Sequence, residues 1–243
     1  MSRKQNYKIE VRICSEAIFS SGEKERNLVH NKVLTNRYGL VYFHAKSLKG
    51  QLKRQAFWIL RQYGRFDPER QASFLTSVSA LFGINRAELQ RINMESEFSL
   101  CGEGMMKLSS LELDKRIRKY FIALQSQDAR DEYYSISPHD LIEAQTRIRT
   151  GIQLEDGKAK DKRLTTYHTV KEGLIFYSSL SFDANPVPYL EDLHLIVRSL
   201  DRIGAGIHRG RGEVETRLLV DGRDMADVNK RNKEGETACG VIA

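Results

Sequence analysis

The sequence has few of the features that mark secreted, disulfide-stabilised or membrane-spanning proteins. Its 243 residues include only three cysteines, which lie far apart at Cys14, Cys101 and Cys239. That spacing provides neither a disulfide framework nor a set of zinc ligands, and it favours a reducing environment. No apolar run approaches the roughly 18 residues that span a bilayer, and residues 1–14 lack the apolar core of a signal peptide. We therefore expect a cytoplasmic protein with no membrane partner, no metal and no cofactor.

Acidic residues are missing from one long stretch near the N-terminus. The whole chain carries 39 Lys and Arg against 32 Asp and Glu, a net charge of +7. Residues 26–66, however, contain nine basic residues and no acid. Further basic clusters occupy residues 147–163 and 198–211. Clusters of one sign attract polyanions such as nucleic acids, which release counterions on binding; a solvated basic surface without a partner is the alternative.

The rest of the composition is that of a folded protein, with 40% hydrophobic and 29% charged residues. Hydrophobic periodicity predicts both strands and helices. The expected elements are strand 7–13, helices 46–63 and 67–82, a helical run over 108–124, strand 174–182, a helix that ends at Gly204, and strand 213–220. The first helix has an apolar stripe made of Leu48, Leu52, Ala56 and Ile59.

This order of elements predicts the fold class. A strand, a helix, a long middle that contains strands, a helix and a strand match an α+β, ferredoxin-like (RRM-like) βαββαβ core. The middle, about residues 84–165, is expected to be a large insertion. We expect residues 1–220 to form a single domain and residues 221–243 a polar C-terminal tail. Four-stranded sheets of this kind often bind RNA, but the fold alone does not establish function.

Glycine and arginine are concentrated in the connection between the last predicted helix and strand, where residues 203–214 are IGAGIHRGRGEV. The candidate binding residues there are Gly204, Gly206, His208, Arg209, Gly210, Arg211 and Gly212. Glycines let the backbone approach a ligand closely, successive N–H groups can bind an anion, and arginines supply charge. The segment therefore predicts a phosphate-binding loop. A tight helix-to-strand connection with incidental arginines is the alternative.

Two other segments favour phosphate contacts. Residues 39–54 lead from a loop into the first helix, and a helix N-terminus beside basic side chains is a natural phosphate site. The candidate residues there are Lys46, Ser47, Lys49, Lys53 and Arg54. The basic cluster over 147–163 adds Arg147, Arg149, Lys158 and Lys160. For the first segment, a capped helix with a solvated basic face is the alternative.

Two aromatic pairs, Tyr42-Phe43 and Phe57-Trp58, lie beside and within the first predicted helix. Aromatic rings can stack on nucleic-acid bases. Such pairs beside a helix more often belong to the core, so we expect at most one member of each pair to touch RNA.

The segments 39–54, 146–164 and 203–214, in this order along the chain, resemble motifs of the RAMP superfamily of CRISPR-associated proteins. A stretch that enters the first helix of its members is matched by Gly39, Tyr42, Ser47, Lys49 and Gly50. Val41, His44 and Ala45 stand where the family usually has Pro, Pro and Gly. A glycine-rich loop near the C-terminus is matched by Gly204, Gly206, Arg209, Gly210 and Gly212. Residues 146–164 are similar to the middle of type III effector subunits, so the matches span roughly residues 7–220.

The resemblance implies a non-catalytic subunit that binds CRISPR guide RNA (crRNA) in a multisubunit, type III-like effector complex of antiviral defence. Such a subunit holds the guide backbone or its 5′ handle. Its implied partners are other RAMP subunits and, through the guide, the target nucleic acid. The candidate residues of the three segments would make the RNA contacts.

The resemblance also bears on catalysis. Repeating backbone subunits of the superfamily cut target RNA with a divalent metal and an Asp in the loop after the first strand, a place that corresponds to residues 29–31 here. That place holds no acid, and Glu23 and Glu25 lie earlier in the loop. This departure favours a subunit that does not cut RNA. The alternatives are a cutting backbone subunit, or a metal-independent guide-processing endoribonuclease that uses His30 or His44 for proton transfer.

Overall fold

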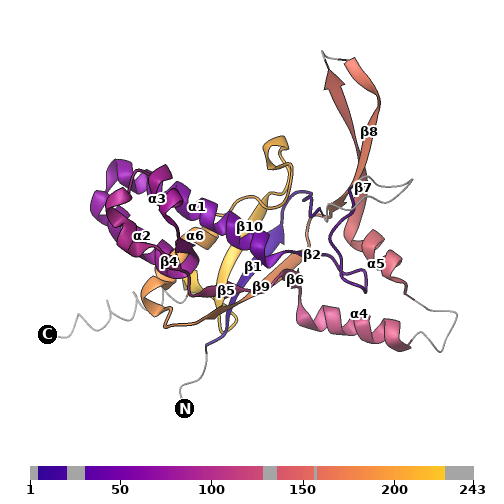
Figure 1. Cartoon of the computed structure of the whole chain (residues 1–243). Helices are drawn as coiled ribbons and strands as arrows, with labels where there is room; N and C mark the ends of the chain where they lie inside the picture. Colours follow the sequence, from indigo (N-terminus) through magenta and orange to yellow (C-terminus); the bar gives the residue numbers. More distant parts are fainter. Residues whose placement is uncertain (1–4, 21–30, 128–135, 156–157, 228–243) are drawn as a thin grey trace.

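Among the residues that the structure describes, seven strands form one antiparallel sheet in the middle of the molecule (Figure 1). The computed structural model describes residues 5–20, 31–127, 136–155 and 158–227. The strands of the sheet are β1 (Tyr7–Ile13), β2 (Tyr42–Phe43), β5 (Met106–Leu108), β6 (Leu111–Leu113), β9 (Ile175–Phe182), β10 (Val214–Val220) and β11 (Arg223–Asp224). Their order is β11-β10-β1-β9-β6-β2, and β5 also pairs with β9. Strands and helices together confirm the predicted α+β class.

Alternating side chains give this sheet one buried and one polar face. Every second residue of β1 is buried, namely Tyr7, Ile9, Val11 and Ile13. β1 lies between β10 and β9, so that Val11 faces Thr216 on one side and Phe176 on the other. The period of two in the sequence over residues 7–13 thus becomes a half-buried strand, as predicted.

Three helices pack against the buried face of the sheet and against one another. They are α1 (Ala45–Phe66), α2 (Pro68–Phe82) and α6 (Leu190–Arg198). The predicted apolar stripe of α1 is confirmed, because all of its members are buried: Leu48, Leu52, Ala56 and Ile59. α2 begins where the Asp67 carboxylate accepts a hydrogen bond of 2.9 Å from the Arg70 amide, and it ends at Gly83.

A buried carboxylate joins α2 to α6. Asp192 of α6 is only 5% exposed, and it accepts hydrogen bonds from the Arg70 guanidinium and the Ser77 hydroxyl, both on α2. Because a buried charge is tolerated only with partners, these contacts determine how the two helices meet.

The other elements divide between the two ends of the sheet (Figure 1). At the end where α1 meets α2 lie α3 (Arg86–Arg91), the 3₁₀ segment Glu95–Leu100 and the two-stranded sheet of β3 (Gly83–Ile84) and β4 (Gly102–Glu103). At the opposite end lie α4 (Lys115–Gln127), α5 (Pro138–Gln145) and the hairpin of β7 (Thr146–Glu155) and β8 (Lys158–Val170). Short 3₁₀ turns, Val187–Tyr189 and Ile207–Arg209, flank α6.

Two predicted helices differ from those observed. The run over 108–124 is not one helix, because Leu111 and Leu113 alternate toward the core as β6 and α4 begins only at Lys115. The helix predicted to end at Gly204 ends at Arg198. The Thr216 hydroxyl of β10 donates to the Val197 carbonyl in the last turn of α6 and to the Leu200 carbonyl just after the helix.

The sheet also recruits segments that the sequence places outside the core. β5 and β6 lie within residues 84–165, the segment expected to be an insertion, yet both pair with β9. Residues 221–227, which the sequence assigns to the tail, contain β11 and the buried Met225. The packed part of the chain therefore extends past residue 220.

Candidate nucleic-acid interface

The glycine-rich loop, residues 203–214, connects α6 to β10 and packs against the chain that follows β1. The Ala205 amide donates a hydrogen bond of 2.9 Å to the Ile18 carbonyl. Gly204 and Gly212 both have positive φ, 88° and 72°. A Cβ on Gly204 would lie 2.6 Å from the Ile18 carbonyl oxygen, so a larger residue cannot stay there without movement of the backbone. These two glycines therefore serve the packing of the loop.

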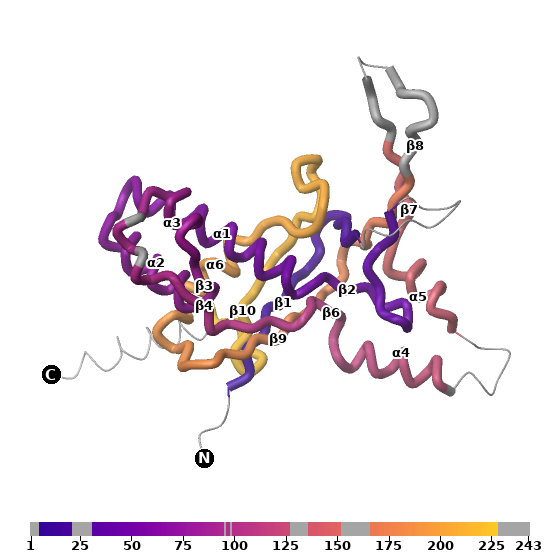
Figure 2. The backbone as a smooth tube through the Cα atoms, in the orientation of Figure 1, coloured from indigo at the N-terminus to yellow at the C-terminus, as the bar shows by residue number. Residues whose placement is uncertain are grey.

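The middle of the loop has a different role. Figure 2 shows it rising from the sheet between α1 and the β7–β8 hairpin. Gly206 and Gly210 flank the 3₁₀ turn Ile207–Arg209 in left-handed conformations, which turn the chain sharply on both sides. As a result, His208 and Arg209 are exposed at the tip.

Arg211 leaves the loop and lies against the hairpin. Its guanidinium carbon is 4.9 Å from the centre of the Tyr167 ring on β8. Its Nη1 atom is buried and has no hydrogen-bond partner among the described residues. An unpaired buried donor costs about 1–3 kcal/mol, which a phosphate oxygen bound at this atom would relieve. The contact of Arg211 with Tyr167 thus joins the loop to the base of the hairpin.

Glu16, just after β1, holds the base of the hairpin. Its carboxylate accepts hydrogen bonds from Arg149 at 2.6 and 3.0 Å, from Arg147 at 3.3 Å and from the Thr169 hydroxyl at 3.1 Å. These contacts, led by Arg149, lower the pKa of Glu16 to about 2. The Glu16 carbonyl also accepts the Gly212 amide at 2.9 Å, so one residue joins β1, the hairpin and the loop.

Two of the predicted RNA-contact residues, Arg147 and Arg149, are therefore partly committed to this ion pair. Each side chain is still 47% exposed, so guanidinium N–H groups remain accessible to a ligand. Lys158 and Lys160 lie on β8, but their side chains are outside the described part of the structure.

The basic residues of α1 fall into two groups. Lys46, Ser47 and Arg54 are exposed. Lys49 and Lys53 are half-buried and have protein partners: the Lys49 ammonium donates to the Met106 carbonyl at 2.7 Å, and Lys53 pairs with Glu88 at 2.7 Å. Burial, followed by repulsion from Lys53, lowers the pKa of Lys49.

The polar face of the sheet carries charges that compensate one another. Arg217 lies 2.8 Å from Glu215 and 3.9 Å from Glu10, and Arg118 pairs with Glu112. A surface whose cations already have acidic neighbours attracts phosphate weakly. The two hairpin arginines share a single acid, Glu16, and Arg209 of the loop is exposed, so the geometry favours the loop and the base of the hairpin, rather than the open sheet face, as the nucleic-acid interface.

The residues considered for catalysis are mostly outside the described ranges, which exclude Glu23, Glu25 and His30. His44 is described; it is exposed, and its ring lies edge-to-face with Tyr42 at 5.4 Å. In the described part of the chain, no three His, Cys, Asp or Glu side chains group as metal ligands would. Nor does any described helix combine the length and apolar character needed to cross a membrane.

Sequence reasoning missed Glu16 and Tyr167. Glu16 is the only acid between the predicted strand 7–13 and Gly22, and the cluster over 147–163 is rich in arginine. An isolated acid and a distant basic cluster are a signal of a possible ion pair, but nothing in their spacing says that they meet. Tyr167 carried no signal.

Comparison with known structures identifies the fold. No protein-family model matches the chain, and no curated protein sequence does. The fold is similar to that of chains in CRISPR effector complexes. Two matches are a chain of the type III-B Cmr-beta complex bound to cognate target RNA and a chain of the same complex in the apo state. Both have a TM-score of 0.57; the identities are 10% and 11%, over 89% and 88% of this chain and 97% of the matched chains.

Proposed function

We propose that the chain is a subunit of a type III-like CRISPR effector complex that binds guide RNA without cutting it, through the guide backbone or its 5′ handle. The similarity of fold to Cmr-beta chains supports this proposal, because it extends over nearly nine-tenths of the chain. One matched structure is of the complex bound to cognate target RNA. By analogy, the partners of this chain are guide RNA, other subunits and, through the guide, target RNA.

The sheet topology supports a ferredoxin-like core for this subunit. With β5 and β6 counted together as the second strand, the order β10-β1-β9-β6 places the four strands as fourth, first, third and second. α1 follows the first strand and α6 follows the third, as in a βαββαβ unit. In this proposal α2–α5 and the β7–β8 hairpin are additions to a single domain.

The observation that carries the proposal is the contact between the loop and the hairpin. Arg211 stacks on Tyr167 and leaves a buried N–H group without a partner, while Arg209 is exposed nearby in the loop. A phosphate bound here would satisfy that group once the Arg211 guanidinium turns toward it, and the neighbouring cations would strengthen its binding. An aromatic ring under the guanidinium holds it in place for such a contact.

The proposed absence of cutting rests on residues 29–31, which hold no acid, and on the state of Glu16. It is the only acid among the described residues between β1 and β2. Metal-assisted RNA cleavage needs a carboxylate free to hold the ion or to activate the attacking group. Glu16 instead accepts hydrogen bonds from two arginines and could bind a metal ion only by releasing them.

The test is RNA binding by the full chain with Arg209 and Arg211 both changed to Ala. Fluorescence anisotropy with a labelled single-stranded RNA of guide length, between about 50 and 200 mM salt, measures affinity and its salt dependence. We expect weaker binding and a log–log slope reduced by about 0.7 for each lost phosphate contact.

The matched control is Arg223→Ala, which removes an exposed arginine near the opposite end of β10. It should leave both quantities nearly unchanged. Unchanged affinity and slope in a correctly folded double variant would remove the loop from the interface and refute the proposal in this form.

A further inference from the structure

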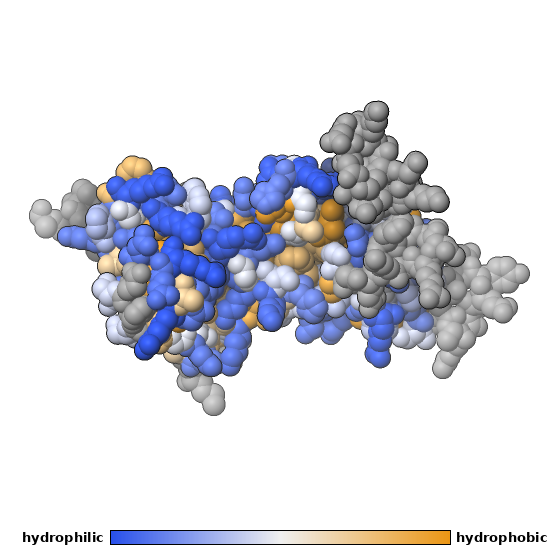
Figure 3. Space-filling model, turned by 45° about the horizontal axis from the view of Figure 1, so that its top comes forward, coloured by the Kyte–Doolittle hydropathy of each residue, from blue (hydrophilic) through white to orange (hydrophobic). Residues whose placement is uncertain are grey.

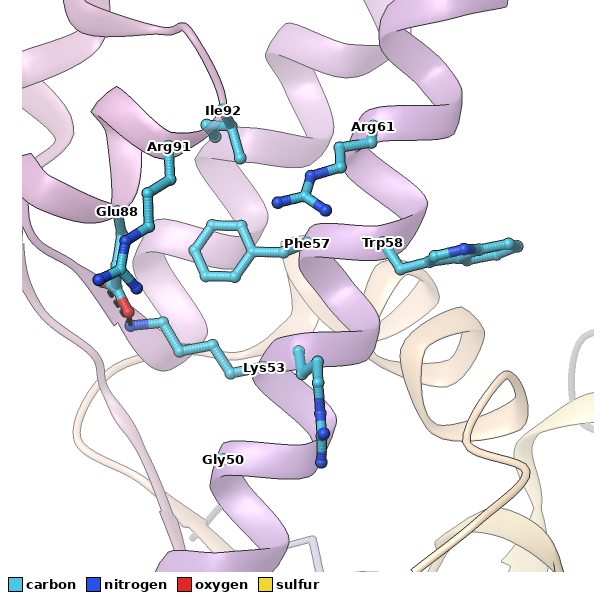
Figure 4. Close-up of a pocket in the computed structure, with 9 residues that line it drawn as sticks. Gly50, Lys53, Phe57, Trp58, Arg61, Glu88, Arg91 and Ile92 are labelled. Carbon is cyan, nitrogen blue, oxygen red and sulfur yellow. Dashed lines mark hydrogen bonds and ion pairs between the residues drawn. The ribbon is translucent and has the colours of Figure 1, made fainter. Parts of the chain in front are cut away.

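A hollow of about 560 Å³ lies between α1 and α3, apart from the loop and hairpin (Figure 4). Phe57 and Arg61 reach it from α1, and Arg91 and Ile92 from the end of α3. Its volume falls in the range of about 300–1,000 Å³ that is usual for small-ligand sites. The hollow is therefore large enough for one ligand of nucleotide size.

Most of the charged side chains that line the hollow are basic. Arg54, Arg61 and Arg91 line it, and none of them has an ion-pair or hydrogen-bond partner recorded among the described residues. The one acid in the lining, Glu88, is already paired with Lys53 at 2.7 Å. Figure 3 shows that hydrophilic side chains cover much of this helical end of the molecule. Unpaired arginines around a cavity favour an anionic ligand, above all one with phosphate oxygens.

Two aromatic rings lie at the hollow. Phe57 points into it between Lys53 and Arg61, and its ring centre is 5.7 Å from the Lys53 ammonium (Figure 4). Trp58 points away from Phe57 at the rim and is 54% exposed, so its indole ring is accessible to a ligand (Figure 4). Flat apolar surfaces beside cations are the combination that nucleic-acid bases and phosphates require.

Gly50 lines the hollow together with Lys53 and Arg54. This glycine lies inside α1, where glycine destabilises a helix relative to alanine. A Cβ placed on it would have no atom within 4 Å, so no packing in the protein requires its absence. The missing side chain leaves space for a ligand beside the helix.

We propose that this hollow binds a nucleotide unit of single-stranded RNA, with its base against Phe57 and Ile92 and its phosphate between Arg61 and Arg91. A neighbouring base would stack on Trp58, so that both members of the Phe57-Trp58 pair would touch RNA, one more than the sequence predicts. The inference rests on the proposed function in that the ligand is RNA, and it adds a second contact away from the loop and hairpin. An acidic peptide could pair with the arginines but would leave the aromatic rings without a planar partner, so the geometry favours a nucleotide.

The test uses Trp58, the only tryptophan of the chain, as an internal fluorophore. The full chain is titrated with a single-stranded hexaadenylate and, separately, with adenosine monophosphate. Stacking should quench the fluorescence saturably with the hexanucleotide. Because only a neighbouring base reaches Trp58, the mononucleotide should not quench by itself. If adenosine monophosphate reverses the quenching by the hexanucleotide at a similar concentration, a free nucleotide is the ligand of the same site, whereas little reversal identifies an RNA strand.

Two kinds of variant test the geometry. Arg61→Ala and Arg91→Ala should each raise the midpoint of the quenching titration about tenfold, whereas Arg65→Ala, near the end of α1 and outside the hollow, should not. Gly50→Leu adds a bulky side chain to the lining of the hollow without a change of charge, and it should also abolish most of the quenching.

The outcomes separate this inference from the proposed function. If the hexanucleotide binds by anisotropy without quenching Trp58, and Arg209→Ala with Arg211→Ala abolishes that binding, the hollow is not a nucleotide site but the proposed function stands. If a hexaglutamate peptide quenches Trp58 and RNA does not, the site belongs to a protein partner and the inference is wrong. Absence of any RNA binding would overturn both.

Discussion

Glu16 offers the sharpest test of the energetics, because its charge joins three parts of the interface. Its carboxylate binds Arg147 and Arg149, and its pKa is about 2 against an ordinary value of 4.5. At about 1.4 kcal/mol per pKa unit, this shift sets a ceiling of roughly 3.5 kcal/mol on its contribution to stability. Each arginine is 47% exposed, and solvent screening reduces the expected contribution to about 1–2 kcal/mol.

We therefore expect Glu16→Gln to lower the free energy of unfolding by about 1–2 kcal/mol at pH 7. Because the pKa is lower in the folded state, the stabilisation is complete above about pH 4.5 and is lost as the pH falls toward 2. The difference between wild type and variant should shrink over the same interval. Urea unfolding followed by circular dichroism at several pH values measures it, and a difference that does not change between pH 7 and low pH would refute the electrostatic explanation.

The same variant should also change RNA binding. Without the carboxylate, Arg147 and Arg149 can turn fully to phosphate, so affinity should rise and the salt slope should steepen by up to about 0.7 for each new contact. Glu213→Gln is the control, because Glu213 is an exposed acid of the same loop with no ion pair recorded in the described structure. If both variants raise affinity equally, the effect is one of net charge and not of released arginines.

Two further predictions concern the core and catalysis. Leu52→Ala should lower the free energy of unfolding by about 2–5 kcal/mol, since Leu52 is fully buried. Lys53→Ala should lower it by at most about 1 kcal/mol, because its pair with Glu88 is partly exposed. Equal losses in urea unfolding would refute the assignment of Leu52 to the buried side of α1 and of Lys53 to its more exposed side. The isolated chain should bind guide RNA but cut neither guide nor target, with magnesium, manganese or chelator. In assembled complexes, a loss of target cutting in His30→Ala or in Glu23→Ala with Glu25→Ala, at unchanged RNA binding, would contradict the non-catalytic assignment.

Local patterns predicted much of the secondary structure because they depend on neighbouring residues. The period of two over residues 7–13 became β1, and the stripe through Leu48 and Leu52 became the buried side of α1. The run over 108–124 misled because its leucines suit a helix or short strands, and pairing of β5 and β6 with β9 decided in favour of strands there. Strand pairing is a non-local interaction that periodicity alone does not report.

The basic residues of the candidate interface show the same contrast between what local sequence predicts and what distant contacts decide. The sequence by itself determined where positive charge is concentrated and that glycines would shape the loop before β10. Only the tertiary structure decided which cations are committed: Arg147 meets Glu16 across 131 residues, and Lys53 meets Glu88 across 35. It also placed Arg211 on Tyr167 and brought Arg61 and Arg91 to one hollow. Composition determines the amount of charge, but the partners of each charge depend on contacts between distant segments, which only folding creates.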